Sequence, residues 1–309
     1  MKPVILPLLY HHVAPTKIIK ERPDQKLFVS TENFYQQILW LNKNFDIISL
    51  EQLVFEVNTS YLRKKPAVLI TFDDGHSDNL HHALPICKGF DTPLCIYLCT
   101  RWMSEKPWLW RHDIVDLIQS VPEIQLTINN KKYHHTIDPA DLSQAYQWCA
   151  AFFVKVHPDQ QYSFLNSLLK NHQREIKIRN DEFLNWDQIA RMNSEPLVTF
   201  GAHTLSHAML SRLSPDEVHH EMMGSKLEIE KHLKQPILHF ASPYGGANAS
   251  GKRESQIAKD VGFKTLITTI PGTCSGESSP DTLLELPRLS IQGQWEIDHF
   301  KQQVQEYLN

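Results

Sequence analysis

The sequence lacks the features of a disulfide-stapled protein and of a membrane-spanning one. It has only five cysteines, an odd number without a Cys-x-x-Cys pair, which favours reduced thiols and a cytoplasmic location. No apolar run approaches the roughly 18 residues that a transmembrane helix requires. The opening stretch MKPVILPLLYHHVAP is interrupted by Pro3, Pro7 and a histidine pair, and it lacks a small-residue cleavage site. We therefore expect a strand there rather than a secretion signal.

Neither sign of charge is in large excess. The chain has 31 Lys and Arg residues against 35 Asp and Glu residues, a formal net charge of -4. This balance gives no general attraction to nucleic acid and no polybasic membrane signal. The apolar fraction of 41% and the charged fraction of 21% are those of an ordinary globular protein. Histidine is frequent, with 17 copies, so a single histidine is weak support for a site.

The order of short apolar runs and amphipathic segments is typical of an α/β fold built from βα units. Helix starts are indicated by Ser49-Leu-Glu-Gln52 and Ser214-Pro-Asp-Glu217, which both have the form of a capping box. Residues 30–44 carry apolar side chains spaced for one buried helical face. We expect strands at residues 4–10, 46–49, 67–72, 94–98, 197–202, 237–241, 264–268 and 286–291.

Between about residues 101 and 194, short apolar runs no longer alternate with amphipathic segments. There EIQLTINNKKYHHTI predicts a β-hairpin turning at Asn129–Asn130, and residues 141–156 and 160–172 predict helices. We interpret this part as a mostly helical insertion within one catalytic domain that covers residues 1–309. Two roles stay open for it, as a cover over the mouth of a site or as a structural appendage.

Three polar segments each follow a predicted strand, where sites of α/β folds are assembled. They are TFDDG (71–75), TFGAHTLSH (199–207) and FASPYGGAN (240–248). Taken alone, DDG can be a turn and a His pair four residues apart can arise by chance in a chain so rich in histidine. On the opening turn of a helix, such a pair would present both rings to one side. Two imidazoles and one carboxylate make a three-ligand site like that of catalytic zinc, and the second aspartate is left as a base.

In these three segments the sequence resembles the polysaccharide deacetylases, the NodB-homology domains that form family four of the carbohydrate esterases. The resemblance spans about residues 67–270. It implies a distorted (β/α) barrel of about seven strands with one divalent metal ion, usually Zn2+. By position, Asp74, His203 and His207 are the implied ligands, and Asp73 is the implied base.

The resemblance also assigns roles to the third segment. The backbone N–H of Tyr244 would stabilise the negative charge that develops on the acyl oxygen. Pro243 would fix this loop, while Gly245 and Gly246 would let the backbone approach the substrate. A simple turn is the alternative interpretation of these residues without the other segments.

Two roles of the family lack their usual residue. The acid that protonates the leaving amine is assigned to His11 in Tyr10-His-His-Val13, a motif that permuted relatives carry near the N-terminus; His12 and His299 are the alternatives. Where many relatives have an arginine that orients the base, this chain has Ser242. Arg288 is the candidate replacement, with a purely structural ion pair as the other possibility. Outside these roles, Asp78 is expected to cap the helix that follows it.

The function that follows is a metal-dependent hydrolase that removes an N-acetyl or other acyl group from an amino sugar. Its partner would be an N-acetylated sugar or oligosaccharide, from a polysaccharide or from a nucleotide-linked or lipid-linked precursor. A lipid-linked substrate would place the protein at the inner face of the membrane. The alternatives are a deformylase or O-deacylase and a non-catalytic carbohydrate-binding barrel. Aspartate-based phosphatases need a D-x-D spacing, which adjacent Asp73 and Asp74 do not provide.

Overall fold

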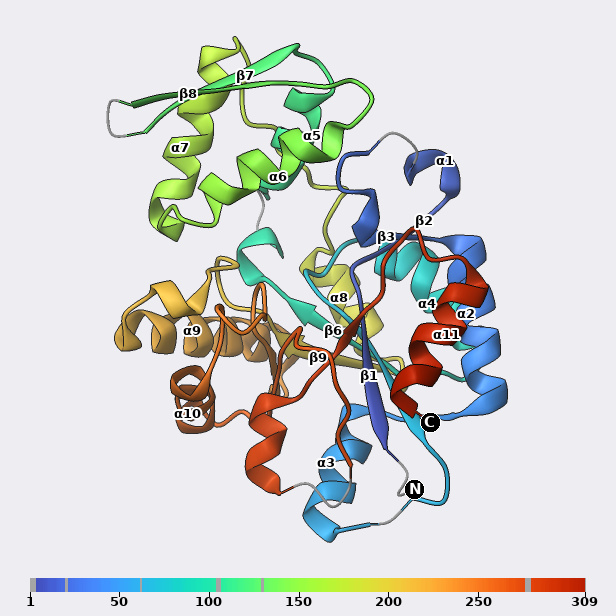
Figure 1. Cartoon of the computed structure of the whole chain (residues 1–309). Helices are drawn as coiled ribbons and strands as arrows, with labels where there is room; N and C mark the ends of the chain where they lie inside the picture. The colour runs from blue at the N-terminus through green and yellow to red at the C-terminus, as the bar shows by residue number, and fades with distance from the viewer. Residues whose placement is uncertain are drawn as a thin grey trace.

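Parallel strands form the centre of the computed structural model (Figure 1), which describes residues 4–19, 22–61, 63–103, 107–128, 131–275 and 279–308. Seven of the strands follow one another in the order β11-β10-β9-β6-β5-β1-β12, and β4 pairs with β5 beside them. All of these pairs are parallel. The strands are β1 (Ile5–Tyr10), β4 (Asp46–Ile47), β5 (Ala67–Phe72), β6 (Leu94–Leu98), β9 (Val198–Ala202), β10 (His239–Ala241), β11 (Thr265–Ile267) and β12 (Leu289–Ser290).

The segment before and within β12 brings the two edges of this sheet together. Leu289 and Ser290 pair with β1, while Leu286, three residues earlier, bridges to Ile267 of β11. One short segment therefore contacts both edge strands and bends the sheet into a distorted barrel. This confirms the predicted seven-stranded α/β barrel. The β4, β10, β11 and β12 strands are each at least two residues shorter than the sequence predicted.

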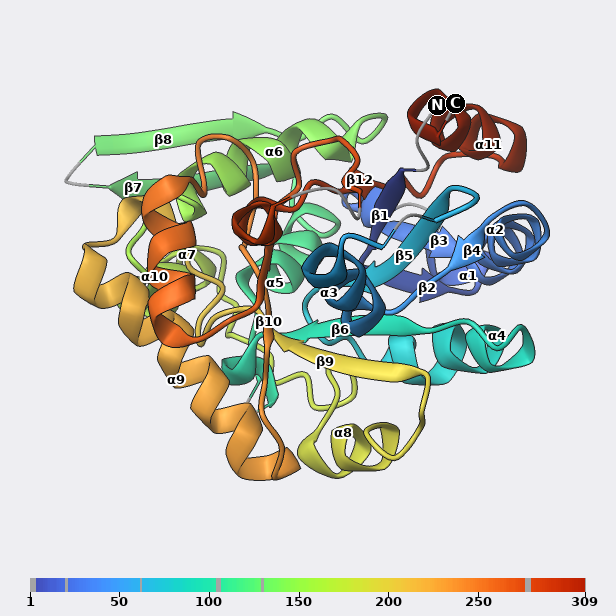
Figure 2. The ribbon, with the colours of Figure 1, turned by 90° about the horizontal axis from the view of Figure 1, so that it is seen from below.

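The pleat of the strands decides which side chains face the barrel interior. Along β5, Ala67 and Leu69 belong to one apolar cluster, and Val68 and Ile70 belong to the other. The smaller cluster fills the barrel and includes side chains of α3 (Leu50–Thr59), which lies across the lower end of the barrel (Figure 2). Because side chains alternate along a strand, Asp73 faces inward at the upper end.

Helices surround the barrel, and their starts follow the predicted caps. Ser49 accepts a hydrogen bond from the N–H of Gln52, and Ser214 and Glu217 form a complete capping box. The helices are α1 (Thr16–Ile19), α2 (Thr31–Asn44), α3, α4 (Leu84–Gly89), α5 (Trp110–Ile118), α6 (Leu142–Phe153), α7 (Pro158–Asn171), α8 (Trp186–Met192), α9 (Pro215–Leu233), α10 (Lys252–Val261) and α11 (Ile297–Leu308). No helix in the described part of the chain is both long and apolar enough to span a bilayer.

The insertion forms a layer above the upper end of the barrel (Figure 1). It contains α5, α6, α7 and the antiparallel hairpin of β7 (Glu123–Ile128) and β8 (Lys131–Thr136). The predicted turn at Asn129–Asn130 lies outside the described residues. α8 falls within the predicted limits of the insertion but packs against α9 beside the barrel. A second small parallel pair, β2 (His12–Ala14) with β3 (Phe28–Ser30), lies between the barrel and the insertion.

Candidate metal centre

The three polar segments meet at the upper end of the barrel. Asp73 and Asp74 directly follow β5, His203 directly follows β9, and Tyr244 lies three residues beyond β10. A groove of about 370 Å3 is lined by Asp73, His203, His207 and Tyr244 together with residues of the insertion. The fold therefore joins TFDDG to two segments that begin more than 120 residues after it in the sequence.

Asp74, His203 and His207 form a buried cluster whose ligand atoms all lie within 4.8 Å of one another. Oδ1 of Asp74 is 3.5 Å from Nε2 of His203 and 3.3 Å from Nε2 of His207. This oxygen is buried, and no described residue donates a hydrogen bond to it. A buried carboxylate oxygen without a donor is costly, and a divalent cation would satisfy it. The donor set of one carboxylate and two imidazoles fits such an ion.

The ring of His203 is held in the orientation that a ligand needs. Its Nδ1 is 2.8 Å from the carbonyl oxygen of Ala241. Because a carbonyl only accepts, Nδ1 carries the proton and Nε2 presents its lone pair toward Asp74. Trp102 stacks on the ring of His207, with centroids 5.2 Å apart. Burial lowers the pKa of His207 to about 4, so its ring is neutral at pH 7.

The prediction that the His pair lies on the opening turn of a helix is wrong. Residues 203–209 form an irregular loop, and α9 begins only at Pro215. Thr204 and His207 have φ angles of 66° and 58°, in the left-handed region, and the N–H of His207 donates to Oγ1 of Thr204 over 2.8 Å. The loop thus folds back on itself, and this turn brings the two rings together.

Asp73 lies beside the cluster and is paired with Arg288. The guanidinium donates to both carboxylate oxygens over 2.7 Å, and Oδ2 of Asp73 is 4.0 Å from Nε2 of His203. Burial by itself would raise the pKa of Asp73, but Arg288 and His203 outweigh it and hold the pKa below its usual value. The arginine expected opposite the base is therefore present, supplied by the segment that closes the barrel rather than by position 242.

Of the three histidines considered as the acid, only His11 lines the groove. Burial lowers its pKa to about 4, against the opposing effect of Asp74 and Asp73. His12 is buried outside the groove, where its Nδ1 is 2.7 Å from Asp78. The expectation that Asp78 caps a helix is wrong, since its side chain makes no cap bond and contacts His12 instead. His299 lies on α11 and packs against Trp295.

The loop after β10 has a backbone conformation that suits a donor role for Tyr244. Tyr244 has a φ of 63°, and no described residue accepts a hydrogen bond from its N–H. Gly245 follows with a φ of +55°, and a Cβ there would lie 2.6 Å from the N of Thr269. Gly245 is thus required by packing against Thr269. Neither Pro243 nor Gly245 lines the groove, so their contact with a substrate stays a prediction.

The sequence profile of the family described as polysaccharide deacetylase matches residues 119–266, which include the His pair and the Pro-Tyr loop. The chain belongs to the polysaccharide deacetylase family. The TFDDG segment precedes the matched range.

One curated relative is a protein of Bacillus subtilis (strain 168) described as "Putative polysaccharide deacetylase YxkH". It is 24% identical over 143 residues, and the match spans 46% of this chain and 46% of that protein. The chain thus matches about half the length of this relative.

Solved structures of deacetylases share the fold over nearly the whole chain. A Streptococcus pyogenes deacetylase, PplD, solved in complex with acetate, has 20% identity and a TM-score of 0.62, covering 98% of both chains. The de-N-acetylase from Aggregatibacter actinomycetemcomitans has 15% identity and a TM-score of 0.63, covering 97% of this chain and 99% of that one. IcaB from Ammonifex degensii has 15% identity and a TM-score of 0.61, covering 98% and 96%. At these identities the likeness shows the fold alone.

The sequence did not indicate two charged residues that line the groove, Lys26 and Arg111. Arg111, the second residue of α5, is mostly buried and lies above the ring of Tyr244, with 5.7 Å from Cζ to the ring centroid. Its NH1 is 3.9 Å from Oδ2 of Asp74, and no carboxylate of the described residues lies closer. No motif marks this arginine, because it comes from the insertion and reaches the site only through the fold. Its position shows that the insertion lines the groove.

Proposed function

We propose that this chain is a metal-dependent hydrolase that removes an N-acetyl group from an amino sugar. The observation that carries the proposal is the position of Asp73. Asp73 lies next to the Asp74–His203–His207 cluster and lines the same groove. A carboxylate beside a site of two imidazoles and one carboxylate is the arrangement of metal-assisted hydrolysis.

Asp74, His203 and His207 would hold one divalent ion, with zinc the proposed metal. When bound, such an ion lowers the pKa of water from about 15.7 toward 7 and polarises an acyl carbonyl. His203 is oriented for this by Ala241, and Asp74 by a left-handed backbone with a φ of 79°. Strained backbone of this kind is stable only when the surrounding structure enforces it.

Asp73 would take the proton from the attacking water. Arg288 keeps its carboxylate ionised, and each oxygen retains a lone pair beyond the one that Arg288 occupies. The N–H of Tyr244 would donate to the acyl oxygen as negative charge develops there. His11 would pass a proton to the departing nitrogen. Because His11 is neutral at pH 7, the proton that it passes on would be the one that Asp73 takes from the water.

The substrate class is an N-acetylated sugar, as a polysaccharide, an oligosaccharide or a linked precursor. The lining of the groove favours a saccharide chain as substrate. The groove runs from the barrel end to the insertion, where the aromatic side chains of Trp110 and Tyr146 line it. Removal of formyl, or of an O-linked acyl group, would use the same residues and is distinguished by the product. A cytoplasmic location also stays a proposal; all five cysteines are free and buried, which agrees with it.

The test is release of acetate and of a free amine from a panel of N-acetylated oligosaccharides and nucleotide sugars. The zinc-loaded protein should release both in equal amounts, and an Asp73→Asn variant with full metal content should release neither. Turnover by the variant at the wild-type rate would overturn the base assignment. Binding of the panel without any release by the wild type would favour a non-catalytic carbohydrate-binding barrel.

A further inference from the structure

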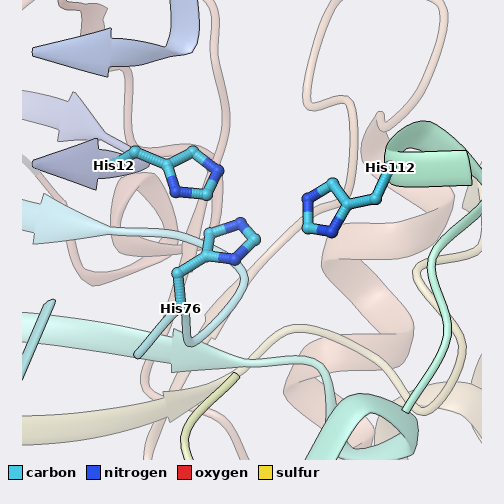
Figure 3. Close-up of side chains that lie close together, drawn as sticks. All are labelled: His12, His76 and His112. Atoms are coloured by element: carbon cyan, nitrogen blue, oxygen red, sulfur yellow. The ribbon is translucent and has the colours of Figure 1, made fainter. Parts of the chain in front are cut away.

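A second group of histidines lies outside the groove and has no part in the proposed reaction. Six of the 17 histidines are buried, and three of these, His12, His76 and His112, form a cluster of their own. Their ligand atoms lie within 4.8 Å of one another. Figure 3 shows the ring of His112 pointing across a gap toward the rings of His12 and His76.

Carboxylates lie behind two of the three rings. Oδ2 of Asp78 is 2.7 Å from Nδ1 of His12, and the carboxylate of Glu182 contacts Nδ1 of His112. A carboxylate at Nδ1 places the proton there, and the lone pair of Nε2 is then free to bind a cation. In Figure 3 the rings of His12 and His112 point toward the space between the three histidines. This is the usual support for imidazoles that bind metal ions.

The third ring has a polar neighbour at only one of its two nitrogens. Nδ1 of His76 is buried and has no hydrogen-bond partner among the described residues, and its Nε2 is 3.4 Å from Oδ2 of Asp74. A buried nitrogen without a partner is destabilising, and a bound cation would satisfy it. His76 follows Asp74 by two residues, so the cluster adjoins the first metal centre.

Simple aromatic packing is the competing explanation for these rings. His12 is stacked between Phe28 and His76, with ring centroids 3.9 Å and 3.7 Å away. Phenylalanine would fill the same space without buried nitrogens and without carboxylates placed behind them. Stacking therefore explains the contact of the rings, but it does not explain Asp78 and Glu182.

We propose that His12, His76 and His112 bind a second divalent metal ion, and that zinc is a suitable ion for this site. Imidazole ligands suit zinc, and zinc bound by three protein nitrogens keeps an open fourth position. Zn–N distances near 2.0–2.1 Å place tetrahedral nitrogens about 3.4 Å apart, so the rings close in around the ion. To bind the same ion as His12, the ring of His76 rotates out of the stack, because two stacked rings cannot direct their nitrogen lone pairs at one point.

A route for the ion exists next to the cluster. A cavity of about 250 Å3 is lined by His12, His112, Asp78 and Glu182, so two ligands and both supporting carboxylates are reachable from it. The cavity is separate from the groove of the first centre, and the two sets of lining residues do not overlap. The second ion therefore has its own access.

The ligands come from three segments that only the fold brings together. His12 lies in β2, His76 in the loop after β5, and His112 in α5 of the insertion. An ion bound by all three ties the insertion to the barrel. Arg111 precedes His112 in the same helix, so the ion would also fix the position of Arg111 in the groove. The ion would therefore also shape the neighbouring groove.

Metal content tests this proposal without any assay of activity. Untagged protein, saturated with Zn2+ and dialysed against metal-free buffer, should hold about two zinc ions per chain. His12→Phe keeps the stack with Phe28 and removes a ligand, so it should hold about one. His112→Gln should do the same and serves if His12→Phe does not fold. The exposed His81 offers a matched control, because His81→Gln should keep two.

The two centres are told apart by the variant that loses the first ion. His203→Ala should also hold about one zinc ion, and a His12→Phe/His203→Ala variant should hold none. Added zinc should raise the melting temperature of His203→Ala but not that of the double variant, because only a site of the folded state is stabilised by its ion. A wild-type protein with a single ion, or a His12→Phe variant that keeps two, would overturn the proposal and leave the proposed activity untouched.

Discussion

Arg288 donates a hydrogen bond to each carboxylate oxygen of Asp73, both over 2.7 Å, and both side chains are buried. The guanidinium also donates to the carbonyl oxygen of Thr268 over 2.7 Å. The hydrogen bond to Thr268 thus fixes Arg288 between β11 and β5, next to the carboxylate of Asp73. Bidentate, charge-assisted pairs of this type are the strong ones, because geometry and charge act together. The base of the proposed reaction is therefore held in one orientation.

Loss of Arg288 should affect both pH dependence and stability. In the wild type the pKa of Asp73 is below its usual value near 3.9, so the base stays ionised until the pH falls under that value. Arg288→Gln should raise this pKa, and the acidic limb of the kcat/KM profile should move to higher pH. The free energy of unfolding should fall by about 3–5 kcal/mol, because a buried carboxylate loses its partner. An unchanged acidic limb in a folded, metal-loaded variant would contradict the role of Arg288.

The pair also predicts how metal-free protein responds to acid. Because the pKa of Asp73 is depressed in the folded state, its contribution to stability is complete above the unfolded value of about 3.9. That contribution is lost as the pH falls through the lower folded value. Urea denaturation of wild type and Asp73→Asn should therefore differ most above pH 4 and converge below it. A difference that grows at lower pH would have the wrong sign.

Substitution of His11 should separate proton transfer from metal binding. His11→Gln should keep its metal and lower kcat by about 100-fold or more, the usual size of a general acid–base contribution. His299→Gln, on α11 away from the groove, should keep both metal and rate. Steady-state kinetics with metal analysis of each variant gives the result. Equal loss of rate in both variants would remove His11 from the mechanism.

Arg111 is expected to bind substrate. Its guanidinium lines the groove, and the nearest carboxylate oxygen in the described part of the chain is 3.9 Å away, so it keeps donors for an incoming polar or anionic group. Arg111→Gln should raise KM about 10-fold or more, which corresponds to loss of a hydrogen bond from a charged group. Metal content should not change. An unaltered KM across the substrate panel would show that the insertion covers the groove without contacting substrate.

Gly245 and Gly246 provide a matched pair for the Pro-Tyr loop. A Cβ at Gly245 would lie 2.6 Å from the backbone N of Thr269 at a φ of +55°, whereas at Gly246 its closest contact would be 4.0 Å away. Gly245→Ala should lower the free energy of unfolding by about 1–3 kcal/mol and reduce turnover as Tyr244 shifts. Gly246→Ala should change little. Thermal unfolding and initial rates of both variants check this, and equal effects would refute the packing argument.

Local chemistry was enough to predict several parts of the fold. Short apolar runs that alternate with amphipathic segments predicted the barrel strands. The Ser214–Glu217 capping box predicted the start of α9. The segments after β5, β9 and β10 were predicted to meet because parallel strands place their carboxyl ends at one edge. The helical placement of His203 and His207 was wrong. A spacing of four residues allows a folded-back loop as well as a helical turn, and the left-handed Thr204 selects the loop.

By itself, the sequence determined the donor types and their order along the chain, and hence the family and the candidate metal ligands. Those features are local, because a strand end or a cap depends on neighbouring residues. Only the tertiary structure decided that Arg288 faces Asp73, that Arg111 enters the groove, and that His12, His76 and His112 converge. Each of these contacts joins segments separated by tens to hundreds of residues, and close packing of the barrel and insertion, which no short pattern encodes, brings them together.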